Sequence, residues 1–257
     1  MSLDSTAQSQ ALEIMRSAQR MVFFTGAGIS TESGLPDYRG PDGVWTTGKV
    51  PTVGEMPKTE QDRLDFWQYR RESYPLMQSR EPNTGHTAIS DLVAHGRAIA
   101  VITQNIDGLH QRSGVPEDRV IELHGSTRKL RCVPSEHIVD GDMVQQQLAQ
   151  GDPDPRCPEC GGVLRSDTVL FGESLPKDAL EIAARVSAVT DVMVVVGSSL
   201  VVYPAAQLPQ IARQRGASLI IIDRAETALD DMADIVVRGE AGEILAALAQ
   251  GVLEDNS

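Results

Sequence analysis

The chain has 257 residues, and its 23 lysines and arginines against 36 aspartates and glutamates give a formal net charge of −13. This length accommodates one large domain, or a main domain that carries a smaller inserted one. Because nucleic-acid affinity depends on clustered basic residues that displace counterions, the charge argues against DNA or RNA as the main ligand. The 41% hydrophobic and 23% charged residues are typical of a globular protein and exclude a disordered or fibrous one.

The sequence predicts a cytoplasmic protein with no membrane segment. Residues 1–10 contain no basic residue and no apolar core, so they do not resemble a secretory signal. The longest apolar runs, Val192–Val196 and Leu219–Ile222, are too short to span a bilayer. Three cysteines, an odd number, indicate metal ligands or free thiols before disulfides in such a chain.

Short β-branched runs alternate with helix-like segments, a pattern typical of βαβ units and a parallel sheet. In chain order, we expect helices over residues 5–19, 84–95, 177–189, 204–215 and 241–249. The expected strands are Val22–Thr25, Ile99–Thr103, Val120–Leu123, Thr168–Phe171, Val192–Val196, Leu219–Ile222 and Ile235–Val237. Several of these runs are apolar throughout, which favours helices on both faces of the sheet. The predicted fold class is therefore α/β, with a doubly wound, Rossmann-like parallel sheet.

Two insertions interrupt this pattern. Residues 40–82 hold proline, glycine and mixed polar residues around one amphipathic piece, Gln61–Met77. Residues 126–167 contain all three cysteines and little apolar periodicity. We expect the two insertions to pack together as a small domain beside the sheet. The predicted sheet domain then comprises residues 1–40, 86–125 and 168–257, and the small domain comprises residues 41–85 and 126–167.

The first expected strand runs into a loop with two glycines, Gly26-Ala27-Gly28-Ile29-Ser30. Such glycines let the backbone approach a pyrophosphate, whose charge is met by the amides of the following helix. The alternative is a tight strand-to-helix turn without a ligand. A dehydrogenase fingerprint needs a third glycine where Thr31 stands and a second strand about 20 residues further on. The insertion begins there instead, so a simple hydride-transfer enzyme is disfavoured.

Five segments, in order, resemble the motifs of the sirtuins, the NAD-dependent protein lysine deacylases. The segments are Gly26–Arg39, Thr103–His110, Glu122–Gly125, Phe171–Glu173 and Val196–Leu200, with Cys157-Pro-Glu-Cys160 between the third and the fourth. The resemblance spans residues 20 to 240 and is of the bacterial type. Within the sirtuins, the segments Pro36–Arg39 and Phe66–Asn83 most resemble the class II branch.

The resemblance implies an NAD-binding sheet domain, a small zinc-ribbon-like domain, and an acyl-lysine protein or peptide bound between them. It also implies a reaction, in which the acyl group of acyl-lysine is transferred to ADP-ribose with release of nicotinamide and O-acyl-ADP-ribose. Two rival functions remain open: transfer of ADP-ribose to a protein, and a non-catalytic sensor of NAD or ADP-ribose.

By resemblance, His124 is the catalytic base and Asn105 binds the ribose or its ordered water. An imidazole with an ordinary pKa of about 6.5 can accept a proton at neutral pH. Asp107 would meet the nicotinamide carboxamide, although Asn-x-Asp after a strand is equally a turn with self-capping side chains. The other histidines, His86, His95, His110 and His137, are expected to be structural.

The cofactor contacts that the resemblance implies lie in four segments. Their members are Gly26, Ala27, Gly28, Asp37, Tyr38, Arg39, Gln104, Asn105, Ile106, Asp107, Gly197, Ser198, Ser199 and Asp223. Tyr38 stands where many members have phenylalanine, and Asp223 where many have asparagine. Because the charge of Asp223 would oppose a phosphate on that ribose, NAD is favoured over NADP.

The resemblance places the peptide backbone against Phe171, Gly172, Glu173 and Val201. The acyl preference stays open. The branch that takes acidic acyl groups carries Tyr-x-x-Arg, and one alignment puts Arg70 at its arginine. Another alignment puts Trp67 over a class II tryptophan, and Arg70 is then a solvated helix charge like Arg71.

The predicted zinc site lacks one usual ligand. Structural zinc takes four cysteine or histidine ligands, commonly in Cys-x₂-Cys pairs. Cys157 and Cys160 form one pair, but Cys132 is followed by Ser135 where the family has its second cysteine. Since neutral serine is a poor ligand, three possibilities remain: His137 completes the set, water does, or the metal is lost.

Overall fold

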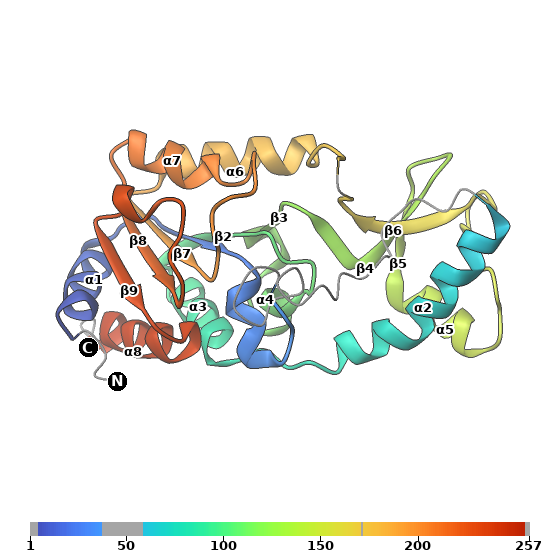
Figure 1. Ribbon diagram of the computed structural model, residues 1–257, viewed down its shortest axis with the longest axis horizontal. Coiled ribbons are helices and arrows are strands. Elements are labelled where there is room, and N and C mark those ends of the chain that lie inside the picture. The colour runs from blue at the N-terminus through green and yellow to red at the C-terminus, as the bar shows by residue number, and fades with distance from the viewer. Residues whose placement is uncertain (1–4, 38–58, 171, 255–257) are drawn as a thin grey trace.

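A six-stranded parallel sheet forms the larger domain of the protein (Figure 1). The computed structural model describes residues 5–37, 59–170 and 172–254. In these residues the strands lie in the order β3-β2-β1-β7-β8-β9. Their bounds are β1 Met21–Thr25, β2 Ala98–Thr103, β3 Val120–Glu122, β7 Val192–Val196, β8 Ser218–Asp223 and β9 Ile235–Arg238. The strand order reverses between β1 and β7, and ligands of open α/β sheets bind at the carboxyl ends beside such a point.

Helices cover both faces of this sheet, as the apolar runs predicted. One face carries α1 (Ser5–Ser17), α3 (Thr84–Ala94) and α8 (Ala241–Glu254), and the other carries α6 (Lys177–Val189) and α7 (Gln207–Gln214) (Figure 1). All residues of β1 and β7 are buried, with Phe23 in the first core and Phe24 in the second. The predicted doubly wound α/β fold is therefore confirmed.

The smaller domain combines parts of both insertions. Its sheet is antiparallel in the order β5-β4-β6, with β4 Gly125–Cys132, β5 Ile138–Asp140 and β6 Leu164–Thr168. Two helices, α2 (Glu60–Gln78) and α5 (Gly141–Ala149), lie beside it at the far end of the molecule (Figure 1). Trp67 of α2 is buried in one cluster with Leu130, Val144 and Leu164. The expectation that the two insertions pack together is thus confirmed.

The smaller domain is also where the predicted elements differ most from the structure. The expected strand at Thr168–Phe171 is wrong, because β6 ends at Thr168 and Phe171 lies outside the described residues. In β6 only Leu164 is fully buried, while Arg165 and Asp167 pair with Glu173 and Arg131. This strand is stabilised by ion pairs along a polar surface, so it carries no apolar run.

Smaller differences concern element ends and short turns. Compared with the expected bounds, α1 ends at Ser17, α7 begins at Gln207 and α8 continues to Glu254. The short elements are η1 Ala27–Ser33, α4 Leu109–Arg112, η2 Glu117–Arg119 and η3 Asp230–Met232. None of the helices in the described part of the chain has the length and apolar character needed to cross a membrane. We retain the domain boundaries given above as a proposal.

Gly125 begins β4 and lies against β6, where the chain passes from the sheet domain into the smaller one. It pairs with Thr168 and has a φ of +72°. A Cβ at this position would lie 1.8 Å from the carbonyl oxygen of Asp167. The conformation and the contact each require glycine here.

Gly125→Ala should destabilise the protein far more than Gly96→Ala. Gly96 has a nearly equal φ of +69°, but a Cβ there meets nothing within 4 Å. In urea unfolding, Gly96→Ala should lower the free energy of unfolding by about 1 kcal/mol, because only the left-handed backbone conformation is penalised. For Gly125→Ala we expect about 3 kcal/mol or more, because β4 and β6 must separate. Equal losses in the two variants would contradict the close contact.

Candidate active site

Buried polar side chains gather at the carboxyl ends of the parallel strands. Ser30 follows β1, Asn105 and Asp107 follow β2, and Ser198 follows β7. All four are buried, with exposed fractions of 2% to 8%. Because buried polar groups require partners, their hydrogen bonds define the arrangement of the site.

Asn105, Ser30 and Asp107 form one hydrogen-bonded cluster. The Asn105 amide nitrogen Nδ2 donates to the Gly26 carbonyl and to Ser30 Oγ, both at 3.1 Å. Ser30 Oγ in turn donates to Asp107 Oδ2 at 2.8 Å. Sequence reasoning did not assign Ser30 a role, although it belongs to the glycine loop that was singled out.

Asp107 also makes the turn that was weighed as the alternative. Its Oδ1 accepts from the backbone N–H of Leu109 at 2.9 Å. Burial raises the pKa of Asp107, and the hydrogen bonds from Leu109 and Ser30 counteract that rise. The same carboxylate thus caps its own turn and reaches the loop after β1, so the turn is confirmed, while the contact with nicotinamide stays a prediction.

His124 lies in the turn between β3 and β4 and is half-buried. Its Nδ1 is 2.8 Å from the carbonyl oxygen of Gln104. Because a carbonyl only accepts, Nδ1 carries the proton and Nε2 is left with a lone pair. Burial lowers the pKa of His124 below its usual value, although the Gln104 hydrogen bond raises it in part. The imidazole is therefore neutral at pH 7 and able to accept a proton.

Gln104 links the ends of β2 and β7. Its side-chain Nε2 donates to Ser198 Oγ at 2.8 Å, while its backbone carbonyl accepts from His124. Two residues after Gln104, Ile106 uses its carbonyl to accept from the N–H of Thr127 in β4. The Ser199 carbonyl accepts from Ala228. The structure thus brings the predicted residues after β2, β3 and β7 to one sheet edge.

The glycines after β1 have a structural cause of their own. Gly26 N–H donates to the Val196 carbonyl at 3.0 Å and Gly28 N–H donates to the Gly197 carbonyl at 2.9 Å. A Cβ on Gly28 would lie 2.6 Å from the Cα of Gly197. The half-buried Ala27 begins η1, a short 3₁₀ helix. Backbone packing against β7 therefore explains these glycines without a ligand.

Asp223 and Asp37 lie at the carboxyl end of β8 and after η1. Asp223 Oδ1 accepts from the N–H of Ala225 at 2.9 Å, and burial raises its pKa against that hydrogen bond. Arg224 is 3.6 Å from Asp37 and 3.5 Å from Glu240. Sequence reasoning missed this ion pair, which connects the end of β8 to the segment after η1. Tyr38 and Arg39, predicted as cofactor contacts next to Asp37, lie outside the described residues.

The residues predicted to contact a peptide lie on two exposed segments. Gly172 and Val201 are exposed, and Val201 has 49% of its surface accessible. Glu173 pairs with Arg165 at 2.7 Å and accepts from the N–H of Leu170 at 3.0 Å. The carboxylate of Glu173 is thus engaged within the chain, and so is its backbone N–H, which donates to the Leu170 carbonyl at 3.0 Å.

The three cysteines converge in the smaller domain, and all of them are free thiols. Their sulfur atoms lie within 4.8 Å of one another, and Cys132 and Cys160 are 3.4 Å apart. Around a tetrahedral zinc with bonds of about 2.3 Å, sulfur ligands lie about 3.8 Å apart. The three thiols of Cys132, Cys157 and Cys160 therefore fit a zinc ion.

Two side chains compete for the fourth position of this cluster. Ser135 Oγ is 3.4 Å from Cys160 Sγ. His137 Nδ1 is 3.8 Å from Cys157 Sγ and 3.1 Å from Glu159. The geometry favours the hydroxyl, whereas the chemistry of zinc favours the imidazole.

Arg70 is neither a solvated helix charge nor turned toward the sheet edge. Its Nη1 donates to the Thr127 carbonyl at 3.2 Å and its Nη2 donates to the Gly141 carbonyl at 3.3 Å. The guanidinium lies 4.0 Å over the Tyr74 ring, and burial lowers its pKa. Only Arg71 is exposed as the helix-charge reading predicted. Arg70 connects α2 to β4 and α5, so it stabilises the smaller domain.

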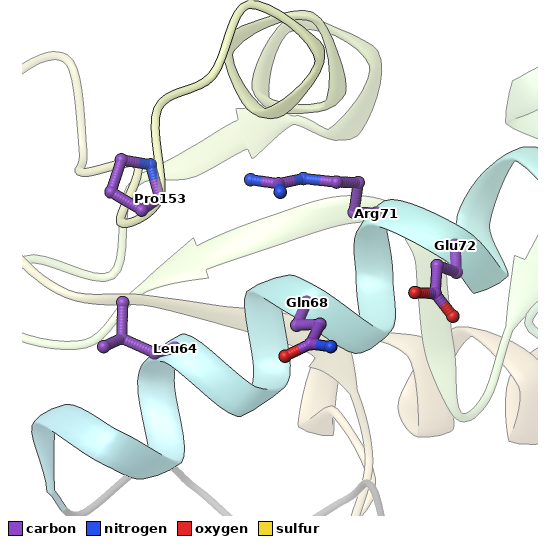
Figure 2. Close-up of a pocket in the computed structure, with 5 residues that line it drawn as sticks. All are labelled: Leu64, Gln68, Arg71, Glu72 and Pro153. Carbon is purple, nitrogen blue, oxygen red and sulfur yellow. The ribbon is translucent and has the colours of Figure 1, made fainter.

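A cavity of about 300 Å³ lies on the outer part of the smaller domain (Figure 2). Figure 2 shows side chains of α2 on one side and Pro153 on the other. Its lining residues are Leu64, Gln68, Arg71, Glu72 and Pro153. None of them belongs to the predicted catalytic, cofactor or metal residues, so the cavity is separate from the site at the sheet edge.

Comparison with known proteins places this arrangement in a family. A family model described as the Sir2 family matches residues 26–204. An NAD-dependent protein deacetylase of Thermodesulfovibrio yellowstonii is 40% identical over 92% of both chains. An NAD-dependent protein deacylase of Pyrobaculum aerophilum is 40% identical over 93% of this chain and 94% of that protein.

Solved structures agree with these relatives. A structure of a Sir2 enzyme has a TM-score of 0.83 at 40% identity and covers 96% of this chain and 98% of its own. A Sir2 complex with a p53 peptide and NAD⁺ has a TM-score of 0.80 at 36% identity, covering 97% and 98%. The chain belongs to the Sir2 family. The predicted resemblance to the sirtuins is thereby confirmed.

Arg70→Met should lower the free energy of unfolding by about 2 kcal/mol, because the carbonyls of Thr127 and Gly141 lose the hydrogen bonds from the guanidinium. Arg71→Met is the matched control, since the neighbouring arginine is exposed. It should change the free energy of unfolding by less than about 0.5 kcal/mol. Urea titration of the two variants measures the difference. Equal effects would show that Arg70 does not stabilise the smaller domain.

Proposed function

We propose that this protein is an NAD-dependent protein lysine deacylase that transfers the acyl group of acyl-lysine to ADP-ribose. The observation that carries the proposal is His124, whose Nδ1–H is held by Gln104 while Nε2 has no hydrogen-bond partner among the described residues. It lies at the same sheet edge as the buried Asn105 and Asp107. The relatives described as NAD-dependent protein deacetylases and deacylases support the same function.

The side chains at this edge suit a dinucleotide. Hydroxyls, an amide and a carboxylate offer the donors and acceptors that ribose and carboxamide groups need. In the proposed arrangement, Asn105 holds the ribose and Asp107 holds the carboxamide of nicotinamide. Further proposed contacts come from Gly26, Ala27, Gly28, Asp37, Tyr38, Arg39, Gln104, Ile106, Gly197, Ser198, Ser199 and Asp223. When bound, NAD supplies a ribose carbon that is activated by loss of nicotinamide.

His124 acts in this proposal as the general base. Its Nε2 accepts the proton of a ribose hydroxyl, which then takes over the acyl group. Because the Gln104 carbonyl fixes the tautomer, the imidazole needs no rearrangement before it accepts this proton. A base in this position favours acyl transfer over an ADP-ribosyltransferase or a non-catalytic sensor, neither of which has a step that needs it.

The proposed partner is an acyl-lysine protein or peptide. The exposed residues Gly172 and Val201 would pair through their backbone with an extended peptide, a mode that tolerates many sequences. We propose Phe171 and Glu173 as further members of this peptide site. Since both ends of the Arg70 guanidinium are engaged by carbonyls, we do not propose Arg70 as a ligand for an acidic acyl group. The acidic Asp223 supports NAD rather than NADP, and we retain the cytoplasm as the proposed location.

We propose that the smaller domain binds one zinc ion through Cys132, Cys157 and Cys160. The fit of the three sulfurs supports this, and zinc, when bound, would connect the end of β4 to the turn at 157–160. Ser135 or His137 would hold the fourth position. The proposed role is structural, because this cluster belongs to the smaller domain and not to the sheet edge.

Incubation with NAD and a panel of acyl-lysine peptides, followed by mass spectrometry of the nucleotides, tests the reaction. The native protein should form O-acyl-ADP-ribose, and His124→Ala should form it at least about 100-fold more slowly. His95→Ala, a change of an exposed histidine on the edge of α3, should leave the rate unchanged. ADP-ribose attached to protein, or equal product from His124→Ala, would contradict the proposal.

Zinc content and retention test the metal site. Protein expressed with added zinc should contain about one zinc per chain. Ser135→Cys should retain the metal against a roughly tenfold higher chelator concentration, because a fourth thiolate replaces a neutral hydroxyl. Ser79→Cys adds an exposed thiol elsewhere and should retain zinc like the native protein. Absence of zinc after supplementation would rule out the site.

A further inference from the structure

A chain of buried hydrogen bonds leads from His110, on α4, to the backbone beside Asn105. His110 has an exposed fraction of 1%, and its Nε2 is 2.9 Å from Thr25 Oγ1. Thr25 Oγ1 donates to Thr103 Oγ1 at 2.9 Å. Thr103 Oγ1 also accepts from the N–H of Asn105 at 3.0 Å. Four polar groups are thus connected inside a region built from apolar strands.

This series of hydrogen bonds ends on the peptide group between Gln104 and Asn105. The N–H of this group is the one held by Thr103, and its carbonyl is the one that accepts from His124 Nδ1 at 2.8 Å. Because a peptide group is planar and rigid, its two ends cannot rotate independently. The direction of the N–H toward Thr103 therefore sets the direction of the carbonyl toward His124.

The hydrogen bonds also define which ring nitrogen of His110 carries the proton. A threonine hydroxyl has one hydrogen, and that of Thr25 is given to Thr103. Thr25 Oγ1 must therefore accept from His110, so Nε2 carries the proton. The ring that faces His110 is His86, with ring centroids 5.0 Å apart. Burial, together with His86, lowers the pKa of His110 well below its usual value, in agreement with a neutral imidazole.

We propose that His110, acting through Thr25 and Thr103, is a positioning residue that orients the Gln104–Asn105 peptide and thereby His124. His110 touches none of the reacting groups. His110 donates to the Thr25 hydroxyl, which is thereby directed at Thr103. The Thr103 oxygen is then held in the position where it accepts from the N–H of Asn105. The result is a fixed Gln104 carbonyl, a fixed tautomer of His124 and a fixed place for the Asn105 side chain. The inference rests on the proposed function, in which His124 is the general base.

The sequence explains why these hydrogen bonds can form without disturbing the sheet. Thr25 and Thr103 are the last residues of β1 and β2 and lie opposite each other in the parallel register. Both end runs of apolar residues, so each places a hydroxyl at the boundary between core and site. Their shape is that of valine, which makes the hydroxyl the only part of the side chain that the apolar core does not require.

Two pairs of variants separate the hydrogen bonds from packing. Thr25→Val keeps the shape of the side chain and removes the hydroxyl, whereas Thr25→Ser keeps the hydroxyl. His110→Phe keeps a flat ring and removes the donor, whereas His110→Gln keeps an N–H donor. Ser187→Ala is the control, because it removes a buried hydroxyl on α6 that takes no part in these hydrogen bonds.

The kinetic readout is kcat and KM for deacylation as a function of pH. Thr25→Val and His110→Phe should lower kcat about tenfold or more, because the base is displaced from its working position. Since the Gln104 hydrogen bond raises the pKa of His124, its loss should also move the acid limb of the profile to lower pH. Thr25→Ser and His110→Gln should restore most of kcat, and Ser187→Ala should leave both quantities unchanged.

A second readout needs no activity. NMR of protein with ¹⁵N-labelled histidine should show His124 in the Nδ1–H tautomer, and Thr25→Val should introduce the Nε2–H tautomer. A purely structural role would lower the melting temperature and leave the tautomer and the pH profile as in the native protein. That result in Thr25→Val and His110→Phe would overturn the inference. Absence of deacylation in the native protein would instead contradict the proposed function, while the NMR measurement still decides this one.

Discussion

The backbone of the loop after β1 lies directly on the backbone at the end of β7, and the geometry of the site depends on this approach. Gly28 and Gly197 are joined by a hydrogen bond of 2.9 Å at the point where the strand order reverses. Without side chains in between, η1 begins at the sheet edge, and Ser30 comes within 3.1 Å of Asn105. A bulkier loop would move Ser30 away and leave buried polar groups unpartnered, which is costly inside a protein.

The positions of the polar side chains follow from the parallel sheet. Strands that run in one direction bring their carboxyl ends to one edge, so residues distant in sequence become neighbours. Asn105, His124 and Ser198 follow three different strands and are connected through Gln104. The amide and hydroxyl groups at this edge of the sheet are neutral, and burial favours the neutral form of His124 by lowering its pKa. Few of the side chains at the site are therefore ionised.

The apolar strands and the presence of a smaller domain were predictable from sequence, whereas the strands of that domain were not. β7 and β8 are continuous runs of aliphatic residues, because both of their faces are buried. β4 and β6 carry arginine and aspartate that pair across the sheet, so their strand character has no apolar signature. The role of Arg70 stayed open at the level of sequence, since only the fold shows that two carbonyls accept from its guanidinium. His110 was expected to be structural, because the sequence does not show that its ring lies against Thr25 at the end of β1.

Trp67 has a consequence for how this protein can be divided and recombined. The indole comes from the first insertion but fills the core formed by the second, and its Nε1–H donates to Asp154 at 3.2 Å. The smaller domain is therefore not a cassette encoded by one continuous stretch of the gene. A transplant of residues 126–167 into another sheet protein would carry a hole where the indole belongs. Exchange between homologous enzymes would have to move α2 together with that segment, which couples the inheritance of two distant parts of the chain.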